Sequence, residues 1–255
     1  MLGGRPRRTD LGGEQVEGRQ AVAELLAARR RPVSDVWMAQ ELQPAPILDR
    51  IEQLAASARV PVRRVSRSRL DAAAATDAPQ GVLAHAGPLP EADFDDLCRP
   101  KSGTKPFLLA VDGVTDPHNL GALLRSAEAA GATGAVLARQ RAVHVTPTVA
   151  KAAAGAVEHV PMAVVAGIPA ALARAKELGC WVVGLAGDGD QSLFDGLAVA
   201  DEAIVVVVGA EGAGLSRLSR ARCDLVASIP MKGRLASLNV SAAGALALFE
   251  VSRRR

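Results

Sequence analysis

The sequence predicts an α/β protein of two units, the second of which is built on a parallel sheet. The run Val205–Val208 is apolar at every position, which is typical of a strand buried on both faces. Further short apolar runs alternate with segments of helical spacing, as in open α/β sheets. Residues 87–106 are rich in proline, glycine and acidic residues, and we expect this stretch to be a linker between the units.

Composition supports a packed interior. The chain has 255 residues, of which 49% are hydrophobic, and this argues against a disordered protein. Only 2% are aromatic and none is tyrosine, so the core must consist of alanine, valine and leucine. The shortage of aromatic side chains also argues against RNA recognition by base stacking.

Positive charge is concentrated at the two ends of the chain. The formal net charge is +3, and arginines gather at Arg5, Arg7 and Arg8 and again at Arg253–Arg255. Such runs are usually solvated tails, and residues 1–13 are predicted to be a flexible basic one. The alternative is that these arginines help to hold a polyanion such as RNA.

Cysteine usage and hydropathy restrict the setting in which the protein works. Cys98, Cys180 and Cys223 lie far apart and form no CxxC pair, so neither a metal site nor a disulfide framework is expected. The N-terminal segment lacks the apolar stretch of a signal peptide, and no segment is long and apolar enough to span a bilayer. We therefore expect a cytoplasmic protein that binds no metal and no membrane.

Residues 14–86 are predicted to form a small α/β domain. The spacing of Val22, Leu25 and Leu26 indicates a first helix. The remaining predicted elements are the strand 33–38, a helix through Ile47, Ile51, Leu54 and Ala58, and the strands 60–65 and 81–84. Five arginines lie in and after the 60–65 strand, where they suit RNA contact or a solvated face: Arg59, Arg63, Arg64, Arg67 and Arg69.

Residues 107–255 are predicted to form the larger domain, in which parallel strands alternate with helices. The strand 107–111 is followed by a loop and by a helix that ends at Gly131. The buried stripe of that helix is Leu120, Leu123, Leu124 and Ala127. The later elements are the strand 134–137, the helical stretch 146–155, the strands 181–185, 205–208 and 225–229, and a last helix from about Val240.

Three loops with polar and glycine residues follow three of these strands. They are 112–119, 209–215 and 230–241. Loops at the carboxyl ends of parallel strands converge on the ligand crevice of an open α/β sheet. Taken singly, each has a plain structural explanation, such as a tight glycine turn after Val208 or capping of the last helix by Asn239.

The order and spacing of the residues in these loops form a recognisable pattern. The segments are Asp112…Asn119-Leu-Gly-Ala…Arg125, then Val208-Gly209-Ala210-Glu211-Gly212…Gly214-Leu215, then Ile229-Pro230-Met231…Ser237-Leu238-Asn239-Val240-Ser241. In this order they resemble the three motifs of the SpoU family, which are S-adenosylmethionine-dependent RNA 2′-O-ribose methyltransferases. The resemblance covers about residues 107–252, and three motifs in order and at matching spacing are specific.

The first domain resembles the L30e-like substrate-binding domain that many members carry, with Val16-Glu17-Gly18-Arg19 leading into its helix. Together with residues 155–161, this arrangement is most similar to the 23S rRNA guanosine 2′-O-methyltransferases. Pro79 stands where the family pattern has His before Gln-Gly-Val, and this departure bears on the substrate rather than the chemistry. The resemblance therefore implies a guanosine of 23S rRNA as substrate, with tRNA methylation and thiostrepton-resistance-type rRNA methylation as alternatives.

The resemblance also implies features that periodicity does not indicate. SpoU domains tie a deep trefoil knot near their C-terminus, an exception to the rule against threaded chains, and they work as homodimers. S-adenosylmethionine lies bent in the knotted loops, and the residues carried over to its binding are Gly209, Ile229, Met231, Ser237 and Leu238. Those carried over to the catalytic centre are Asn119, Arg125, Glu211 and Asn239.

Arg125 corresponds to the family's usual candidate for the base that accepts the hydroxyl proton. A guanidinium stays protonated and offers no acceptor atom. Two roles are therefore open: Arg125 acts as the base after desolvation, or it binds a neighbouring phosphate and orients the hydroxyl. The second is slightly favoured because it needs no free acceptor.

Two other classes compete with this interpretation. A nicotinamide-dependent oxidoreductase needs GxGxxG after an early strand, whereas Gly209, Gly212 and Gly214 give GxxGxG late in the chain. A non-catalytic RNA-binding module would suit the first domain and the basic ends, but it has no need of polar residues in three converging loops. The four histidines show neither metal-ligand spacing nor a Ser/His/Asp arrangement.

Overall fold

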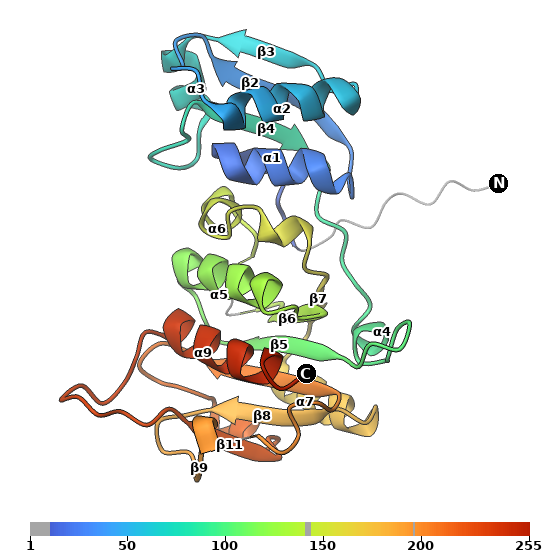
Figure 1. The fold of residues 1–255 in the computed structure, drawn as a ribbon, viewed down its shortest axis with the longest axis vertical. Coiled ribbons are helices and arrows are strands. Elements are labelled where there is room, and N and C mark those ends of the chain that lie inside the picture. The colour runs from blue at the N-terminus through green and yellow to red at the C-terminus, as the bar shows by residue number, and fades with distance from the viewer. Residues whose placement is uncertain (1–10, 141–143, 196) are drawn as a thin grey trace.

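The computed structural model describes residues 11–140, 144–195 and 197–255 and has two stacked α/β units (Figure 1). A four-stranded sheet with its helices lies at one end of the molecule, and a seven-stranded sheet lies at the other. The predicted fold class, a parallel-sheet α/β domain preceded by a small α/β domain, is confirmed. Arg5, Arg7 and Arg8 of the predicted basic tail lie outside the described residues.

The four-stranded sheet belongs to the first unit. Its elements are β1 (Gln15–Glu17), α1 (Arg19–Ala28), β2 (Val33–Ala39), α2 (Pro46–Ser57), β3 (Val62–Val65), α3 (Arg67–Ala73) and β4 (Val82–Ala86). The strand order is β1-β4-β2-β3, and only β2 and β3 are parallel. α1 and α2 supply Val22, Leu25 and Ile51 to its core. β1 and α3 escape sequence analysis because β1 has three residues and α3 buries only Leu70.

The seven-stranded sheet belongs to the second unit, and every neighbouring pair of its strands is parallel. The strand order is β7-β6-β5-β10-β8-β11-β9. Its elements are β5 (Phe107–Asp112), α5 (Pro117–Ala129), β6 (Gly134–Ala138), α6 (Pro147–Ala152), η1 (Ala156–Glu158), β7 (Met162–Val165), α7 (Ile168–Glu177), β8 (Trp181–Leu185), β9 (Gln191–Ser192), η2 (Leu193–Asp195), β10 (Ile204–Gly209), α8 (Arg217–Arg220), β11 (Leu225–Ser228) and α9 (Val240–Ser252).

Helices cover both faces of this sheet, and β10 lies at its centre between β5 and β8. Val206 and Val208 face the core that α5, α6 and α9 share, while Val205 and Val207 face the core that contains α7. All four valines are therefore buried, which explains the uninterrupted apolar run. β7 and α7 are absent from the sequence-based prediction.

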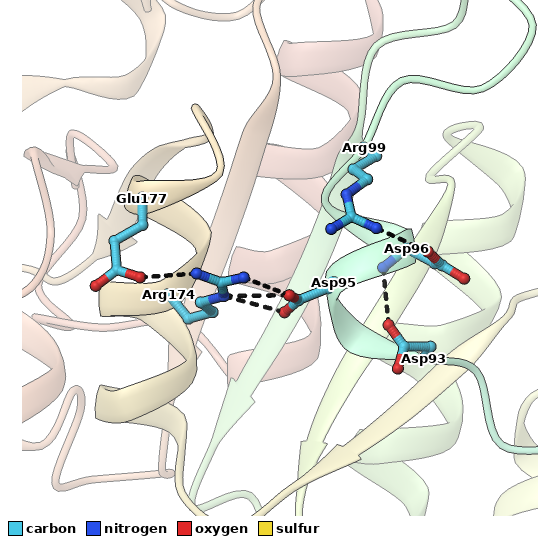
Figure 2. Close-up of polar contacts among 6 residues, drawn as sticks. All are labelled: Asp93, Asp95, Asp96, Arg99, Arg174 and Glu177. Atoms are coloured by element: carbon cyan, nitrogen blue, oxygen red, sulfur yellow. Dashed lines mark hydrogen bonds and ion pairs between the residues drawn. The ribbon is translucent and has the colours of Figure 1, made fainter.

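The segment 87–106, predicted to be a linker, packs against the second unit. It contains the short helix α4 (Phe94–Leu97), and Leu89, Leu97 and Cys98 are buried in the two cores of the large sheet. Figure 2 shows Arg174 of α7 directed at Asp95 of α4, with Nη2 and Oδ2 2.5 Å apart. Leu11, which precedes the first unit in the sequence, is also fully buried in a core of the large sheet. Both flanks of the first unit are thus tied to the second.

The C-terminal arginines are exposed, but they are held in place by hydrogen bonds and ion pairs. Arg253 and Arg254 pair with Glu250, which is only 7% exposed. Arg255 donates to the carbonyls of Lys105 and Glu202 at 2.8 and 3.0 Å. The usual interpretation of such a run as a free tail is therefore wrong at this end of the chain.

One buried ion pair joins the two units. Arg31, which follows α1, pairs with Glu158 of η1 at 2.5 Å, and the two side chains are 2% and 1% exposed. Arg31 also donates to the carbonyls of Gly13 and Gly87, where the chain enters and leaves the first unit. These bonds fix the first unit on the second, in contrast to the freedom that a proline-rich linker suggests.

Within the described residues, no helix is both long and apolar enough to cross a membrane.

We predict that the Arg31–Glu158 pair is strongly coupled. Arg31→Met leaves the buried Glu158 carboxylate without its ion-pair partner, and Glu158→Gln does the same to the Arg31 guanidinium. Each single variant should therefore lower the free energy of unfolding by about 3–5 kcal/mol, measured by urea denaturation. The double variant should cost clearly less than the sum of the two. Lys105→Gln, which breaks the exposed pair with Glu202, is the control and should cost about 1 kcal/mol or less. Additive single effects would contradict the coupling.

We also predict a pH-dependent contribution from the α4–α7 contact. The Arg174 guanidinium holds the pKa of the Asp95 carboxyl below its usual value, so the pair stabilises the fold above about pH 4 and this contribution is lost as the pH falls through the folded-state pKa. Asp95→Asn should lower the urea midpoint at pH 7, and its difference from the wild type should shrink in acid. Asp96→Asn, which breaks only the local pair with Arg99, is the matched control. If the difference in urea midpoint between Asp95→Asn and the wild type stayed constant in acid, the pH-dependent contribution of this pair would be excluded.

Candidate active site

A pocket of about 490 Å³ opens at the carboxyl ends of β8, β10 and β11. Residues 185–187 line it after β8, 208–212 line it from the end of β10, and 236–240 line it before α9. β8 lies between β10 and β11 in the sheet, so their loops necessarily meet at one edge. The volume is in the range, about 300–1,000 Å³, that is usual for small-molecule sites.

The wall of the pocket at the end of β10 is made of main chain. A Cβ on Gly209 would lie 2.1 Å from the carbonyl carbon of Gly214, so only glycine fits there. The loop closes on itself, because Ala210 and Gly214 exchange backbone hydrogen bonds of 2.9 and 2.8 Å. Gly212 and Gly214 have φ angles of 77° and 66°, in the left-handed region that favours glycine. The sequence GxxGxG therefore encodes a tight turn that exposes main-chain groups to the pocket.

The side chain of Asn119 links the three predicted loops. Its Nδ2 donates to Glu211 Oε2 at 3.0 Å, and its Oδ1 accepts from Asn239 Nδ2 at 2.9 Å. Asn239 Oδ1 in turn accepts from the amide and hydroxyl of Ser241 at 2.9 and 2.6 Å. Asn119 itself is 9% exposed, whereas Glu211 and Asn239 are exposed, so its two bonds are partly buried.

Helix capping aims these side chains. Asp116 is the N-cap of α5 and accepts from the backbone amide of Asn119 at 2.9 Å, with Pro117 in the first turn. Asn239 is the N-cap of α9, so the plain capping explanation holds for it together with its bond to Asn119. Asp112 accepts from the backbone amide of Ser216 at 3.0 Å and so ties the first loop to the second.

The third loop is the exposed wall of the pocket. Residues 231–239 are all exposed, including Met231 at 37% and Leu238 at 40%. The residues that sequence analysis assigned to the cofactor all line the pocket: Gly209, Ile229, Met231, Ser237 and Leu238. Glu211 and Asn239, assigned to the catalytic centre, line it as well.

Two predicted site residues, Asn119 and Arg125, do not line the pocket. Asn119 is joined to it by its hydrogen bonds to Glu211 and Asn239, whereas Arg125 lies away from it. Arg125 is exposed on α5, one turn before the end of the helix, while Leu123 and Leu124 beside it are buried. Within the described residues it has no hydrogen bond, ion pair or carboxylate partner. It lies seven residues after His118, which is also exposed, so the two share one face of α5.

Sequence analysis did not find the β8 side of the pocket. Leu185, Ala186 and Gly187 line it, as do Ala227 and Ala243. A signal was available, because a loop after the strand next to β10 must reach the same edge of a parallel sheet. In the described part of the chain, no cluster of three or more His, Cys, Asp or Glu residues could hold a metal ion.

Comparison with known proteins places this geometry in a family. The chain matches the SpoU rRNA Methylase family over residues 106–249, and the family described as RNA 2′-O ribose methyltransferase substrate binding over residues 15–92. It is 38% identical to the 23S rRNA (guanosine-2′-O-)-methyltransferase RlmB of Pseudomonas putida over 95% of this chain and 97% of the relative. It is 37% identical to the putative TrmH family tRNA/rRNA methyltransferase YacO of Bacillus subtilis over 95% and 96%.

Solved structures agree with the sequence comparison. The SpoU methyltransferase AviRb from Streptomyces viridochromogenes, solved in complex with the cofactor AdoMet, has a TM-score of 0.79 and 25% identity, and the match covers 99% of this chain and 94% of that one. The match therefore spans both units and the pocket between β8, β10 and β11. By sequence and by structure, this chain belongs to the SpoU rRNA Methylase family.

Proposed function

We propose that this chain transfers a methyl group from S-adenosylmethionine to a ribose 2′-hydroxyl of RNA, and that its substrate is a guanosine of 23S rRNA. The hydrogen bonds by which Asn119 joins the first loop to the two loops that line the pocket carry the proposal. Two observations support it: relatives named for this reaction match nearly the whole chain, and the similar AviRb structure contains AdoMet.

The pocket fits the cofactor by size and by chemistry. Main-chain groups after β10 can bind a nucleoside closely because Gly209 has no Cβ, and Met231 and Leu238 offer apolar surface at the rim. We assign cofactor binding to these three residues together with Ile229 and Ser237. When bound, S-adenosylmethionine supplies an electrophilic methyl group on a sulfonium.

The remaining task of the protein is positioning. A ribose oxygen must approach the methyl carbon in line, and holding reactants in such a geometry accounts for much of the rate. Glu211, Asn119 and Asn239 form one hydrogen-bonded chain at the mouth of the pocket, and we assign to them the shape of the catalytic centre. As the oxygen–carbon bond forms and the carbon–sulfur bond breaks, the hydroxyl proton must pass to an acceptor.

Arg125 is assigned to binding of a phosphate near the reacting ribose. Its guanidinium is exposed and has no carboxylate partner in the described part of the chain, so its charge is available to a polyanion. This assignment agrees with the chemistry of a guanidinium, which has no acceptor atom for a proton.

We further propose that the protein is a cytoplasmic homodimer whose second unit carries the trefoil knot of its family. Leu246 and Phe249 of α9 are 40% and 50% exposed and lie on one face of the helix, as a self-complementary contact requires. Residues 14–86 would form the L30e-like substrate-binding domain and residues 107–255 the methyltransferase domain.

The test is transfer of labelled methyl from S-adenosylmethionine to 23S rRNA, 16S rRNA and tRNA transcripts, followed by nucleoside analysis. The proposal predicts 2′-O-methylguanosine in 23S rRNA alone. Product in tRNA would support the proposed methyl transfer but contradict 23S rRNA as the substrate. No product in any RNA, together with no cofactor binding, would contradict the proposal and favour a non-catalytic RNA-binding module.

Gly209→Ala should damage the cofactor site. The added methyl would overlap the Gly214 backbone and force the loop open, so the dissociation constant for S-adenosylmethionine should rise about tenfold or more in calorimetry. Gly233→Ala, in the exposed loop of the same pocket, meets no atom within 4 Å and is the matched control. Equal affinities for the two variants would show that close main-chain approach at Gly209 is not used.

Arg125→Ala should leave cofactor affinity near normal, because the side chain lies outside the pocket, and should reduce methyl transfer by about 100-fold or more. Single-turnover assays at saturating cofactor measure this loss. Arg217→Ala removes an exposed arginine from α8 and serves as the control. Retained turnover in the Arg125 variant would exclude both the base and the phosphate-binding roles.

A further inference from the structure

A polar patch lies outside the pocket, where the two units meet. It consists of Arg19 at the start of α1, Gln80 in the loop before β4, and Lys151 in α6, and we call it the seam patch. The first two residues come from the first unit and the third comes from the second. In Figure 1 the loop between α3 and β4, the α6 region below it and the long loop between β11 and α9 all lie on the left side of the molecule.

The three side chains gather around one glycine. A Cβ on Gly18, whose φ is 93°, would lie 3.4 Å from Gln80 Oε1 and 3.5 Å from Lys151 Cγ. Arg19 adjoins it and donates from its backbone amide to Gln80 Oε1 at 3.1 Å, and from Nε to the Gln80 carbonyl at 3.2 Å. The patch is therefore a defined arrangement of side chains from both units.

The loop that carries Gln80 has a left-handed residue and is held by hydrogen bonds to a buried carboxylate. Gln80 has a φ of 57°, a left-handed conformation that is uncommon for a residue with a side chain. The carboxylate of Glu17, which is fully buried, accepts from the backbone amides of Ala75 and Thr76 at 2.6 and 3.1 Å. Strained residues persist where the surroundings over-determine them, and they concentrate at functional sites.

The positive charges of the seam patch are not neutralised within the described chain. Neither Arg19 nor Lys151 has an ion pair there, and the Lys151 ammonium contacts only the Thr76 hydroxyl, at 3.5 Å. Asp77, the carboxylate of the same loop, is exposed and pairs with neither of them. By contrast, Arg63, Arg64 and Arg67 of the arginine cluster noted in the sequence all pair with carboxylates. Unpaired cations at a fixed spacing favour an anionic partner.

We propose that the seam patch binds a backbone phosphate of the substrate RNA, with Arg19 and Lys151 as its cationic contacts. This inference rests on the proposed function. The patch draws on both units, and the Arg31–Glu158 pair fixes them to each other, so the distance from the patch to the pocket is constant. RNA held at the seam is thereby presented to the pocket in a fixed register, and the patch positions substrate without taking part in the reaction.

The test compares Arg19→Gln, Lys151→Gln and the double variant with the wild type in binding to a full-length 23S rRNA transcript across a range of salt concentrations. Each single change should weaken RNA affinity several-fold and reduce the slope of log affinity against log salt by about one unit, because one phosphate contact is lost. Lys151→Arg, which keeps the charge, should restore affinity. The controls Arg99→Gln and Lys105→Gln remove exposed cations near α4 and β5, on the opposite side in Figure 1.

Cofactor affinity, measured on the same samples, separates the possible outcomes. Unchanged S-adenosylmethionine binding with a reduced salt slope supports the seam site and shows that the variants are folded. If the wild type methylates RNA while the seam variants bind RNA with wild-type affinity and slope, the seam inference is wrong and the proposed function stands. If the wild type neither binds nor methylates RNA, both are overturned.

Discussion

The hydrogen bonds of Asn119 are the constraint on which the site depends. β5, β10 and β11 are separated by long stretches of sequence, and a parallel sheet brings only their ends to a common edge. Asn119 donates to Glu211 through Nδ2 and accepts from Asn239 through Oδ1, because a side-chain amide carries both a donor and an acceptor. The three loops are thereby joined to one another. Because each partner is also tied to its own loop or helix cap, the arrangement is set before any ligand arrives.

A second constraint acts between the units. The Arg31–Glu158 pair is buried, and the same guanidinium bonds the backbone where the chain enters and leaves the first unit. Buried ion pairs contribute little net stability compared with apolar packing, but they demand one geometry. A fixed orientation of the first unit relative to the second is needed if one unit binds an RNA and the other modifies it. The packing of Leu11, Leu89 and Leu97 on the large sheet's cores serves the same end.

Much of this architecture could be predicted from the sequence, and the failures have physical causes. β10 is predictable because a strand buried on both faces needs apolar residues throughout. The glycines after it indicate the close approach of Gly209 to Gly214. The third motif then predicted five of the residues that line the pocket, Ile229, Met231, Ser237, Leu238 and Asn239, but not Ala236 or Val240. β7 and α7 were missed because β7 has only four residues and α7 is short and rich in alanine, so both carry weak periodicity.

Other failures arise from tertiary contacts that no local pattern encodes. Prolines in residues 87–106 suggest a loose connection, yet α4 is fixed through Asp95 and Arg174, which are far apart in sequence (Figure 2). Arg255 looks like a tail residue, but carbonyls from two loops satisfy its guanidinium. Arg125 was predicted to belong to the catalytic centre, and the structure places it on the exposed face of α5, outside the pocket.

The most direct test of this account is calorimetric titration of S-adenosylmethionine into the Asn119→Leu variant. Leucine fills the space but removes the hydrogen bonds to Glu211 and Asn239, and because both partners are exposed each lost bond should cost about 0.5–1.5 kcal/mol. The account predicts a dissociation constant at least about tenfold above that of the wild type. Ser126→Ala removes a hydrogen bond to the Ala122 carbonyl from the same helix, and this control should bind normally. Wild-type affinity in Asn119→Leu would mean that the three loops form the site without the bonds that join them, and the central claim would be wrong.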